Sequence, residues 1–196
     1  PKALLFGEVD DAAARLEKPG SQLSMIFSVS YGLAVLFEDR GVVPDAMTGH
    51  SMGEYVAACL AGVFSFEDAL GLVLLRGQLM DRVDVGAMLS VPLTEEAIAP
   101  LLGPDLDLAG VNAPDLMLVS GPVPAIEALE KTLEAQDVEP QRVRIDRAAH
   151  SRMFDPILED FRAYISKMKL QPPTKRFVSS NTGTWITPEQ ATDPNY

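Results

Sequence analysis

The sequence predicts an α/β fold in which a small ferredoxin-like unit is inserted into a larger unit. Two patterns carry this prediction. The first third of the chain reads as helix, strand, sharp turn, helix and helix, whereas residues 87–147 read as βαββαβ, the order of a ferredoxin-like motif. The chain has 196 residues, 47% of them hydrophobic, which suffices for a core and excludes intrinsic disorder. We therefore expect residues 1–86 and 148–196 to form the larger unit.

The larger unit is expected to begin with an apolar helix over residues 22–39. This stretch lacks a clean polar face, which is typical of a helix packed on several sides, and Gly41 and Pro44 would end it. Its most apolar part, residues 25–37, is too short to cross a bilayer. We therefore expect a buried helix here.

Turn and cap signals place the other elements of the larger unit. The expected elements are a short strand within residues 45–50, helices over residues 54–60, 66–80 and 151–168, and a strand over residues 177–180. A loop that contains glycine and proline is expected after this last strand. Gly62 stands where a helix commonly ends, and Ser65 followed by Asp68 resembles a capping box.

Strand and helix patterns alternate within the inserted unit. The expected strands cover residues 87–93, 106–111, 116–120 and 141–145, and the expected helices cover residues 94–102 and 124–136. Thr94 would cap the first helix and Gly103 would close it.

Charge and cysteine content exclude several classes of protein. The net charge of −12 argues against broad affinity for nucleic acids or anionic membranes. The single cysteine, Cys59, cannot form an internal disulfide, and no Cys/His pairs have zinc spacing, so we expect no metal site. No basic-then-apolar leader opens the sequence. We therefore expect a soluble, cytoplasmic protein.

Residues 49–53 (GHSMG) form the pattern Gly-x-Ser-x-Gly between an expected strand and an expected helix, the setting of a nucleophile elbow. The tight turn requires small residues at Gly49 and Gly53. Ser51 would project at the start of the helix, where free backbone N–H groups favour developing negative charge. The N–H of Met52 is the natural first oxyanion donor. A structural turn is the alternative interpretation.

A serine nucleophile needs a general base, and the chain contains two histidines, His50 and His150. His50 directly precedes Ser51 and should project away from it as a packed, hydrogen-bonded support. His150 follows the last strand of the inserted unit, where the chain returns to the larger unit. We assign His150 as the base, with a surface histidine in a loop as the alternative.

Several motifs together resemble the acyltransferase domains of modular polyketide synthases and their relative, malonyl-CoA:acyl carrier protein transacylase. The matching segments are residues 49–54 (GHSMGE), 74–77 (LLRG), 110–114 (GVNAP), 119–121 (VSG), 149–151 (AHS) and 179–184 (SSNTGT). Their order and spacing agree over essentially the whole chain. The resemblance implies a hydrolase-like α/β large subdomain that carries Ser51 and a ferredoxin-like small subdomain, with the active site in the cleft that they share.

The resemblance also implies a ping-pong acyl transfer in polyketide biosynthesis, with no bound cofactor. Ser51 would attack the thioester of an acyl-CoA with His150 as base, and the phosphopantetheine thiol of an acyl carrier protein would collect the acyl group. Arg76 would pair with the free carboxylate of a malonyl-type substrate, which its planar fork suits. Asn112 and Ala149 would also lie at the substrate. Neighbouring synthase domains in the same polypeptide are expected partners.

The chain departs from the family pattern at its ends and at its specificity positions. It lacks the Gly-Gln-Gly-x-Gln segment near the family N-terminus and stops before the last strand, so we expect truncation at both ends and assign no third triad carboxylate. Met52 agrees with malonyl selection, whereas the small Ala149 leaves space for an α-methyl group. We favour malonyl, with methylmalonyl as the alternative.

Two other functions share parts of this pattern. A serine hydrolase, an esterase or thioesterase, would use the same Ser51 and His150, but a buried Arg76 opposes a fatty acyl chain. A non-catalytic scaffold that docks other synthase domains is the second. For the transferase, we expect part of residues 142–176, with nine basic and four acidic side chains, to face the acidic carrier protein and the CoA phosphates.

Overall fold

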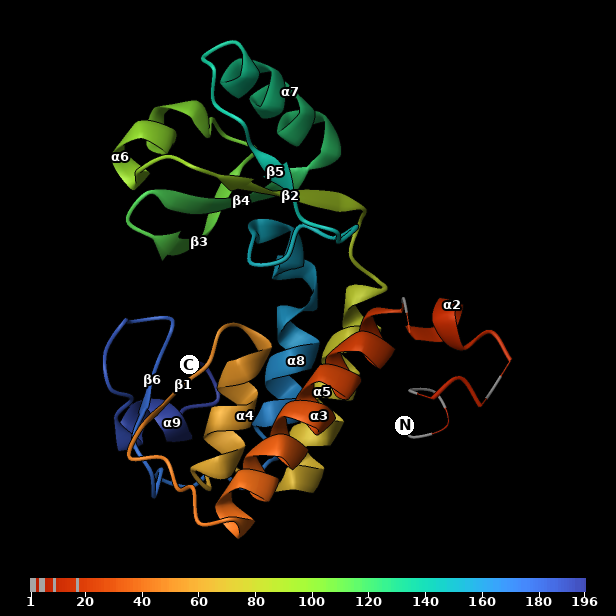
Figure 1. Ribbon diagram of the computed structural model, residues 1–196, viewed down its shortest axis with the longest axis vertical. Helices are drawn as coiled ribbons and strands as arrows, with labels where there is room; N and C mark the ends of the chain where they lie inside the picture. Colours follow the sequence, from red (N-terminus) through yellow and green to blue (C-terminus); the bar gives the residue numbers. More distant parts are fainter. Residues whose placement is uncertain (1–2, 4–5, 9, 17) are drawn as a thin grey trace. The chain divides into compact units, whose positions relative to one another are not determined.

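The computed structural model describes residues 3, 6–8, 10–16 and 18–196, which fall into two compact units (Figure 1). The discontinuous unit comprises Pro1–Leu79 and Glu159–Tyr196, and the inserted unit comprises Met80–Leu158. The inserted unit thus extends on both sides of residues 87–147.

The discontinuous unit is built mainly from helices around a short parallel sheet. Its elements are α2 (Ala12–Leu16), α3 (Pro19–Asp39), β1 (Met47–Thr48), α4 (Met52–Leu60), α5 (Phe66–Met80), α8 (Leu158–Ile165), β6 (Phe177–Val178) and α9 (Pro188–Thr192). Helices α3, α4 and α5 meet in a core that includes Phe27, Met52 and Val73. A second cluster joins α4 to Phe177 of β6 and Ala191 of α9. Helix α4 therefore packs on both sides.

Strands β1 and β6 pair in parallel, with Met47 opposite Phe177 and Thr48 opposite Val178. The carboxyl ends of parallel strands meet at one edge of a sheet, where α/β proteins place their ligands. The segment after β1, which contains Ser51, therefore lies beside the segment after β6, residues 179–184.

Helix α3 is longer and more exposed than the sequence predicts. Pro19 begins it, three residues before the expected start, because proline suits the first helical turn. The helix has 21 residues, and its length and apolar composition also satisfy the criteria for a membrane span, which core helices of soluble proteins satisfy as well. Among its residues, Met25 and Phe27 are buried, whereas Leu33 and Phe37 are exposed. The expectations of a stretch too short to cross a bilayer and of a buried helix are thus wrong for α3.

The predicted caps in this unit are confirmed. Gly62 follows α4 with a φ of +79°, the left-handed conformation that glycine adopts most easily. Before α5, the Ser65 hydroxyl accepts the Asp68 N–H at 3.0 Å and donates to the Asp68 carboxylate at 2.9 Å. These contacts satisfy donors that the helix start leaves unpaired.

The inserted unit has the predicted ferredoxin-like order. Its elements are β2 (Gly86–Val91), α6 (Glu95–Ile98), η1 (Ala99–Leu101), β3 (Asp107–Ala113), β4 (Leu116–Pro122), α7 (Val123–Glu134), β5 (Gln141–Arg142) and η2 (Arg152–Ile157). The strands form one sheet in the order β3-β4-β2-β5, and each neighbouring pair is antiparallel. The core under this sheet includes Leu89, Ile98, Val119, Ile126 and Leu133.

Several other elements differ from the sequence prediction, and three of them have a clear local signal. The helix expected over residues 151–168 is a 3-10 helix followed by α8, since Pro156 lies inside η2 and removes a backbone donor. Strand β5 ends at Arg142, because the Ile145 N–H turns back to the Val143 carbonyl. Helix α9 was expected as a loop, although Thr187 and Gln190 form a complete capping box that signals it.

Candidate functional site

Ser51 occupies a strained turn at the start of α4. Its φ is 49° and its ψ is −107°, a conformation that non-glycine residues rarely adopt and that is typical of functional sites. It immediately precedes Met52, the first residue of α4, whose N–H has no acceptor within the helix. The serine hydroxyl and a helical N–H thus originate from adjacent residues.

Steric contacts require glycine at only one of the two glycine positions of the motif. A Cβ added to Gly49 would lie 2.1 Å from the carbonyl carbon of Gly53, so this position requires glycine. A Cβ added to Gly53 would meet nothing within 4 Å. The expectation of small residues is therefore explained for Gly49 alone.

We expect Gly49→Ala to destabilise the fold by about 1–3 kcal/mol, because a side chain there overlaps backbone atoms. Gly53→Ala is the matched control. It adds a methyl group to an open helical position and should leave stability unchanged or raise it by up to about 1 kcal/mol. Urea unfolding followed by circular dichroism measures both. Equal destabilisation by the two variants would contradict the close approach at Gly49.

The loop after β6 is bonded to both ends of the elbow. The Ser180 N–H donates to Oε1 of Glu54 at 2.7 Å, and the Ser180 hydroxyl donates to the Gly49 carbonyl at 2.9 Å. Ser179, fully buried, contacts the Tyr196 hydroxyl. Sequence reasoning missed the contacts of Glu54 and Ser180. The parallel order of β1 and β6 is the signal that could have found them.

Arg76 lies on α5, half-buried, with its guanidinium carbon 5.4 Å from the ring centre of Tyr55 on α4. A guanidinium over an aromatic face is attracted by the ring quadrupole. Tyr55 follows Ser51 by one helical turn. Gly77, the residue after Arg76, allows α5 to approach α3 closely, since a Cβ at this position would lie 2.1 Å from the Gly20 Cα. Helix packing and the Tyr55 ring together orient Arg76.

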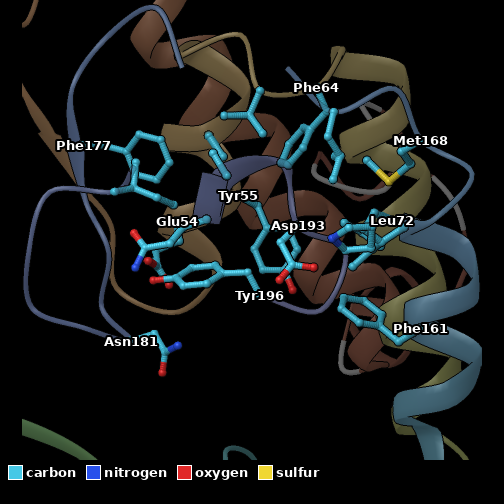
Figure 2. A pocket seen from close by; sticks show the side chains of 18 residues that line it. Glu54, Tyr55, Phe64, Leu72, Phe161, Met168, Phe177, Asn181, Asp193 and Tyr196 are labelled. Atoms are coloured by element: carbon cyan, nitrogen blue, oxygen red, sulfur yellow. The ribbon is translucent and has the colours of Figure 1, made fainter. Parts of the chain in front are cut away.

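A largely apolar cavity of about 250 Å³ lies elsewhere in this unit (Figure 2). Its lining includes Glu54, Tyr55, Phe161, Asn181 and Tyr196. Neither Ser51 nor Arg76 lines it. The cavity is thus distinct from the predicted reaction site.

His150 lies in the inserted unit, in a segment that follows β5. It is exposed and has a φ of 60°, in the left-handed region. The preceding residue, Ala149, is buried in a hydrophobic cluster with Met88 and Leu118. The Ser151 hydroxyl donates to the Ala148 carbonyl at 2.6 Å. The backbone on both sides of His150 is therefore anchored, while the residue itself is exposed.

The structure assigns the predicted site residues to both units. Ser51, Met52 and Arg76 belong to the discontinuous unit, and Asn112, Ala149 and His150 to the inserted unit. Asn112 is exposed on β3, at an irregularity in the β3–β4 register. His50 is exposed, so the expectation that it is packed is wrong, whereas its role as a hydrogen-bonded support stays a prediction. Its carbonyl nevertheless accepts the Gly53 N–H at 2.9 Å and closes the first turn of α4.

Comparison with known proteins identifies the family. The profile of the acyl transferase domain matches residues 20–193. The chain belongs to the acyl transferase domain family. Because the match begins inside α3, this apolar helix is a part of the domain.

Relatives of this acyl transferase domain are polyketide synthases. The chain is 38% identical over 191 residues to a phenolphthiocerol/phthiocerol polyketide synthase of Mycobacterium tuberculosis H37Rv, covering 97% of the chain and 13% of that protein. The acyl transferase domain of ZmaA superimposes with a TM-score of 0.88 at 42% identity, over 95% of the chain and 44% of the other. Malonyl CoA-acyl carrier protein transacylase from Burkholderia pseudomallei gives a TM-score of 0.85 at 28% identity. The match covers 95% of the chain described here and 67% of the transacylase chain. The chain thus spans about an eighth of the curated relative.

The acyl transferase domain has one cysteine, and its environment makes it a poor nucleophile. Burial raises the pKa of the Cys59 thiol to about 11, so the thiolate is scarce at neutral pH. Among the residues that the structure describes, no three His, Cys, Asp or Glu side chains are grouped to hold a metal ion.

The basic segment at residues 142–176 contributes to both units of the domain. Several of its cations have partners in their own unit: Arg142 with Glu130, Arg147 with Asp146, Arg152 with Asp107 and Lys175 with Glu38. Arg176 lies over the Trp185 ring. These pairs reduce the charge available to an acidic partner, and the carrier-facing role of this segment stays a prediction.

Proposed function

We propose that this acyl transferase domain transfers a malonyl-type group from coenzyme A to the phosphopantetheine thiol of an acyl carrier protein. One observation carries the proposal: Ser51 forms a strained turn directly before α4, and the neighbouring α5 bears the Arg76 guanidinium, which lies over the ring of Tyr55 on α4. The first group suits acyl transfer and the second suits a carboxylate on the acyl group.

In the first half-reaction, Ser51 Oγ attacks the thioester carbonyl of the acyl-CoA while His150 accepts the hydroxyl proton. The carbonyl oxygen becomes an oxyanion, which the Met52 N–H stabilises at the positive end of α4. The C–S bond then breaks, and His150 gives its proton to the departing CoA thiolate. The products are acyl-Ser51 and free CoA.

The second half-reaction reverses these steps with another thiol. The phosphopantetheine thiol of the carrier protein gives its proton to His150 and attacks the acyl-Ser51 ester. Collapse of the second oxyanion breaks the bond to Ser51 Oγ, which recovers the proton. No redox step or cofactor is required, and we place the reaction in the cytoplasm, within a polyketide synthase.

Substrate selection is assigned to three side chains. Arg76 binds the free carboxylate of the acyl group, for which two parallel N–H donors are suited. The buried Met52 side chain favours malonyl, and the small Ala149 leaves room for an α-methyl group. Malonyl is the favoured substrate and methylmalonyl the second, with Asn112 as a further contact.

Intact-mass measurement after incubation with an equimolar mixture of acetyl-, malonyl- and methylmalonyl-CoA tests the function. We expect one adduct on Ser51, at the mass of malonyl, which disappears when carrier protein with its phosphopantetheine is added. An adduct that is lost to water as fast as to the carrier indicates a hydrolase. Absence of any adduct, together with no labelling by a fluorophosphonate, indicates a scaffold.

A further inference from the structure

We infer that Asp107 and Arg152 form a clamp that positions His150 for proton transfer. The inference rests on the proposed role of His150 as the general base. All residues of the clamp belong to the inserted unit. Asp107 and Arg152 are positioning residues. They act on His150 through the backbone of residues 148–152, the histidine segment.

The clamp consists of several hydrogen bonds that join the histidine segment to the start of strand β3 and to the loop before it. The backbone N–H of Arg152 donates to Asp107 Oδ2 at 2.9 Å, and the guanidinium donates to Asp107 Oδ1 through Nη2 at 2.7 Å and through Nε at 3.0 Å. Nη1 donates to the Pro104 carbonyl at 2.9 Å. Asp107 is the first residue of β3 and pairs with Ser120 of β4. Arg152 is thereby tied to a rigid element.

The other side of His150 is anchored by packing. Ala148 is fully buried, and a Cβ added to Gly86 would lie 2.6 Å from the Ala148 Cβ, so strand β2 and Ala148 are in close contact. Between this anchor and the clamp, His150 adopts a φ of 60°, which costs free energy for a residue with a side chain. A strained conformation persists only where its surroundings impose it, and the clamp is one polar part of those surroundings, beside the Ser151 hydroxyl that donates to the Ala148 carbonyl.

The clamp is charged under physiological conditions. Hydrogen bonds from Arg152 lower the pKa of the Asp107 carboxyl below its ordinary value, so the carboxylate stays ionised at neutral pH. An ionised acceptor makes the bidentate contact with arginine stronger and geometrically more specific than a neutral one.

The same unit offers a matched control pair. Arg142 donates to Glu130 through Nε and Nη2, both at 2.6 Å, and this contact joins β5 to α7. It too lowers the pKa of its carboxyl group through hydrogen bonding. The two pairs share their chemistry and their unit, but only one is attached next to His150.

The test compares Asp107→Ala, Asp107→Asn, Glu130→Ala and His150→Ala. For each protein we would measure the rate constant and the final extent of Ser51 labelling by a fluorophosphonate, and kcat and KM for malonyl-CoA. Displacement of a base by about 1 Å can cost on the order of 10²-fold in rate. We expect Asp107→Ala to lower the rate constant and kcat by about 10- to 100-fold, with the final extent and KM unchanged.

The remaining variants separate positioning from stability and from the proposed function. Asp107→Asn keeps an oxygen acceptor and should fall between wild type and Asp107→Ala, and Glu130→Ala should stay within about twofold of wild type, since exposed ion pairs contribute little. A reduced extent of labelling with an unchanged rate constant, or equal losses in the Asp107→Ala and Glu130→Ala proteins, would overturn the clamp. If His150→Ala labels at the wild-type rate, the base assignment itself fails. If His150→Ala is slow and Asp107→Ala is not, only the clamp is wrong.

Discussion

Replacing Ser51 with alanine is expected to abolish the acyl-enzyme, because no other nucleophile has its position at the start of α4. Replacing His150 with alanine should slow acylation by on the order of 10² or more, since proton transfer by a positioned base contributes that much. The measurement is the time course of the malonyl adduct by intact mass. An adduct that persists on the Ser51→Ala protein would refute the assignment of the nucleophile.

Two residues of the chain provide matched controls for this experiment. Ser65 precedes α5 as Ser51 precedes α4, but it caps its helix through Asp68. Ser65→Ala should lose about 1 kcal/mol of stability and keep its acylation rate. His50 is the other histidine of the chain. If His50→Ala slows acylation by on the order of 10² and His150→Ala does not, His50 is the base and the assignment of His150 is wrong.

Arg76→Ala should remove selectivity for a carboxylated acyl group while Ser51 stays reactive. A charge-assisted hydrogen bond is worth roughly 1.5–3 kcal/mol, so kcat/KM for malonyl-CoA should fall by about 10- to 150-fold. Acetyl-CoA has no carboxylate to pair with, and its turnover should be unchanged or higher, because an unpaired half-buried cation no longer opposes it. A competition between the two substrates measures the ratio directly.

Two further variants control for charge and for ring contact at this site. Arg162→Ala removes an exposed arginine of α8 in the same unit and should leave selectivity unchanged. Tyr55→Phe keeps the aromatic face under Arg76 and should also preserve it. If malonyl-CoA and acetyl-CoA lose activity by the same factor in Arg76→Ala, the arginine is structural and the dicarboxylate assignment is wrong.

The sequence predicts those parts of the fold that depend on local chemistry. The Ser65 cap, the turn at Gly62 and the order of helices and strands along the inserted unit are confirmed, because each depends on a few neighbouring residues or on a simple period. Helix α9 was missed although its capping box is equally local. In that case proline and glycine nearby suggested a loop and outweighed the cap signal.

Contacts between distant segments could not be predicted in the same way. The bonds from Ser180 to the elbow depend on the parallel pairing of β1 with β6, and the clamp depends on where β3 begins. Neither leaves a trace in hydrophobic periodicity. For α3 the sequence predicted burial that the structure does not show. Apolar composition indicates that a helix tends to be buried, but it does not specify which element packs against it.

The division of the chain has a consequence for the order in which it folds during synthesis. The inserted unit is continuous in sequence, so it can fold once residue 158 has emerged from the ribosome, as domains generally fold as units during synthesis. The discontinuous unit depends on the pairing of Met47 with Phe177, a contact of high sequence separation that forms late. The bonds from Ser180 to Gly49 and Glu54 span an equally large sequence separation. A nascent chain can therefore complete residues 148–152 while the segment after β6 is still unmade, and the contacts of that segment with the serine turn require synthesis past residue 180.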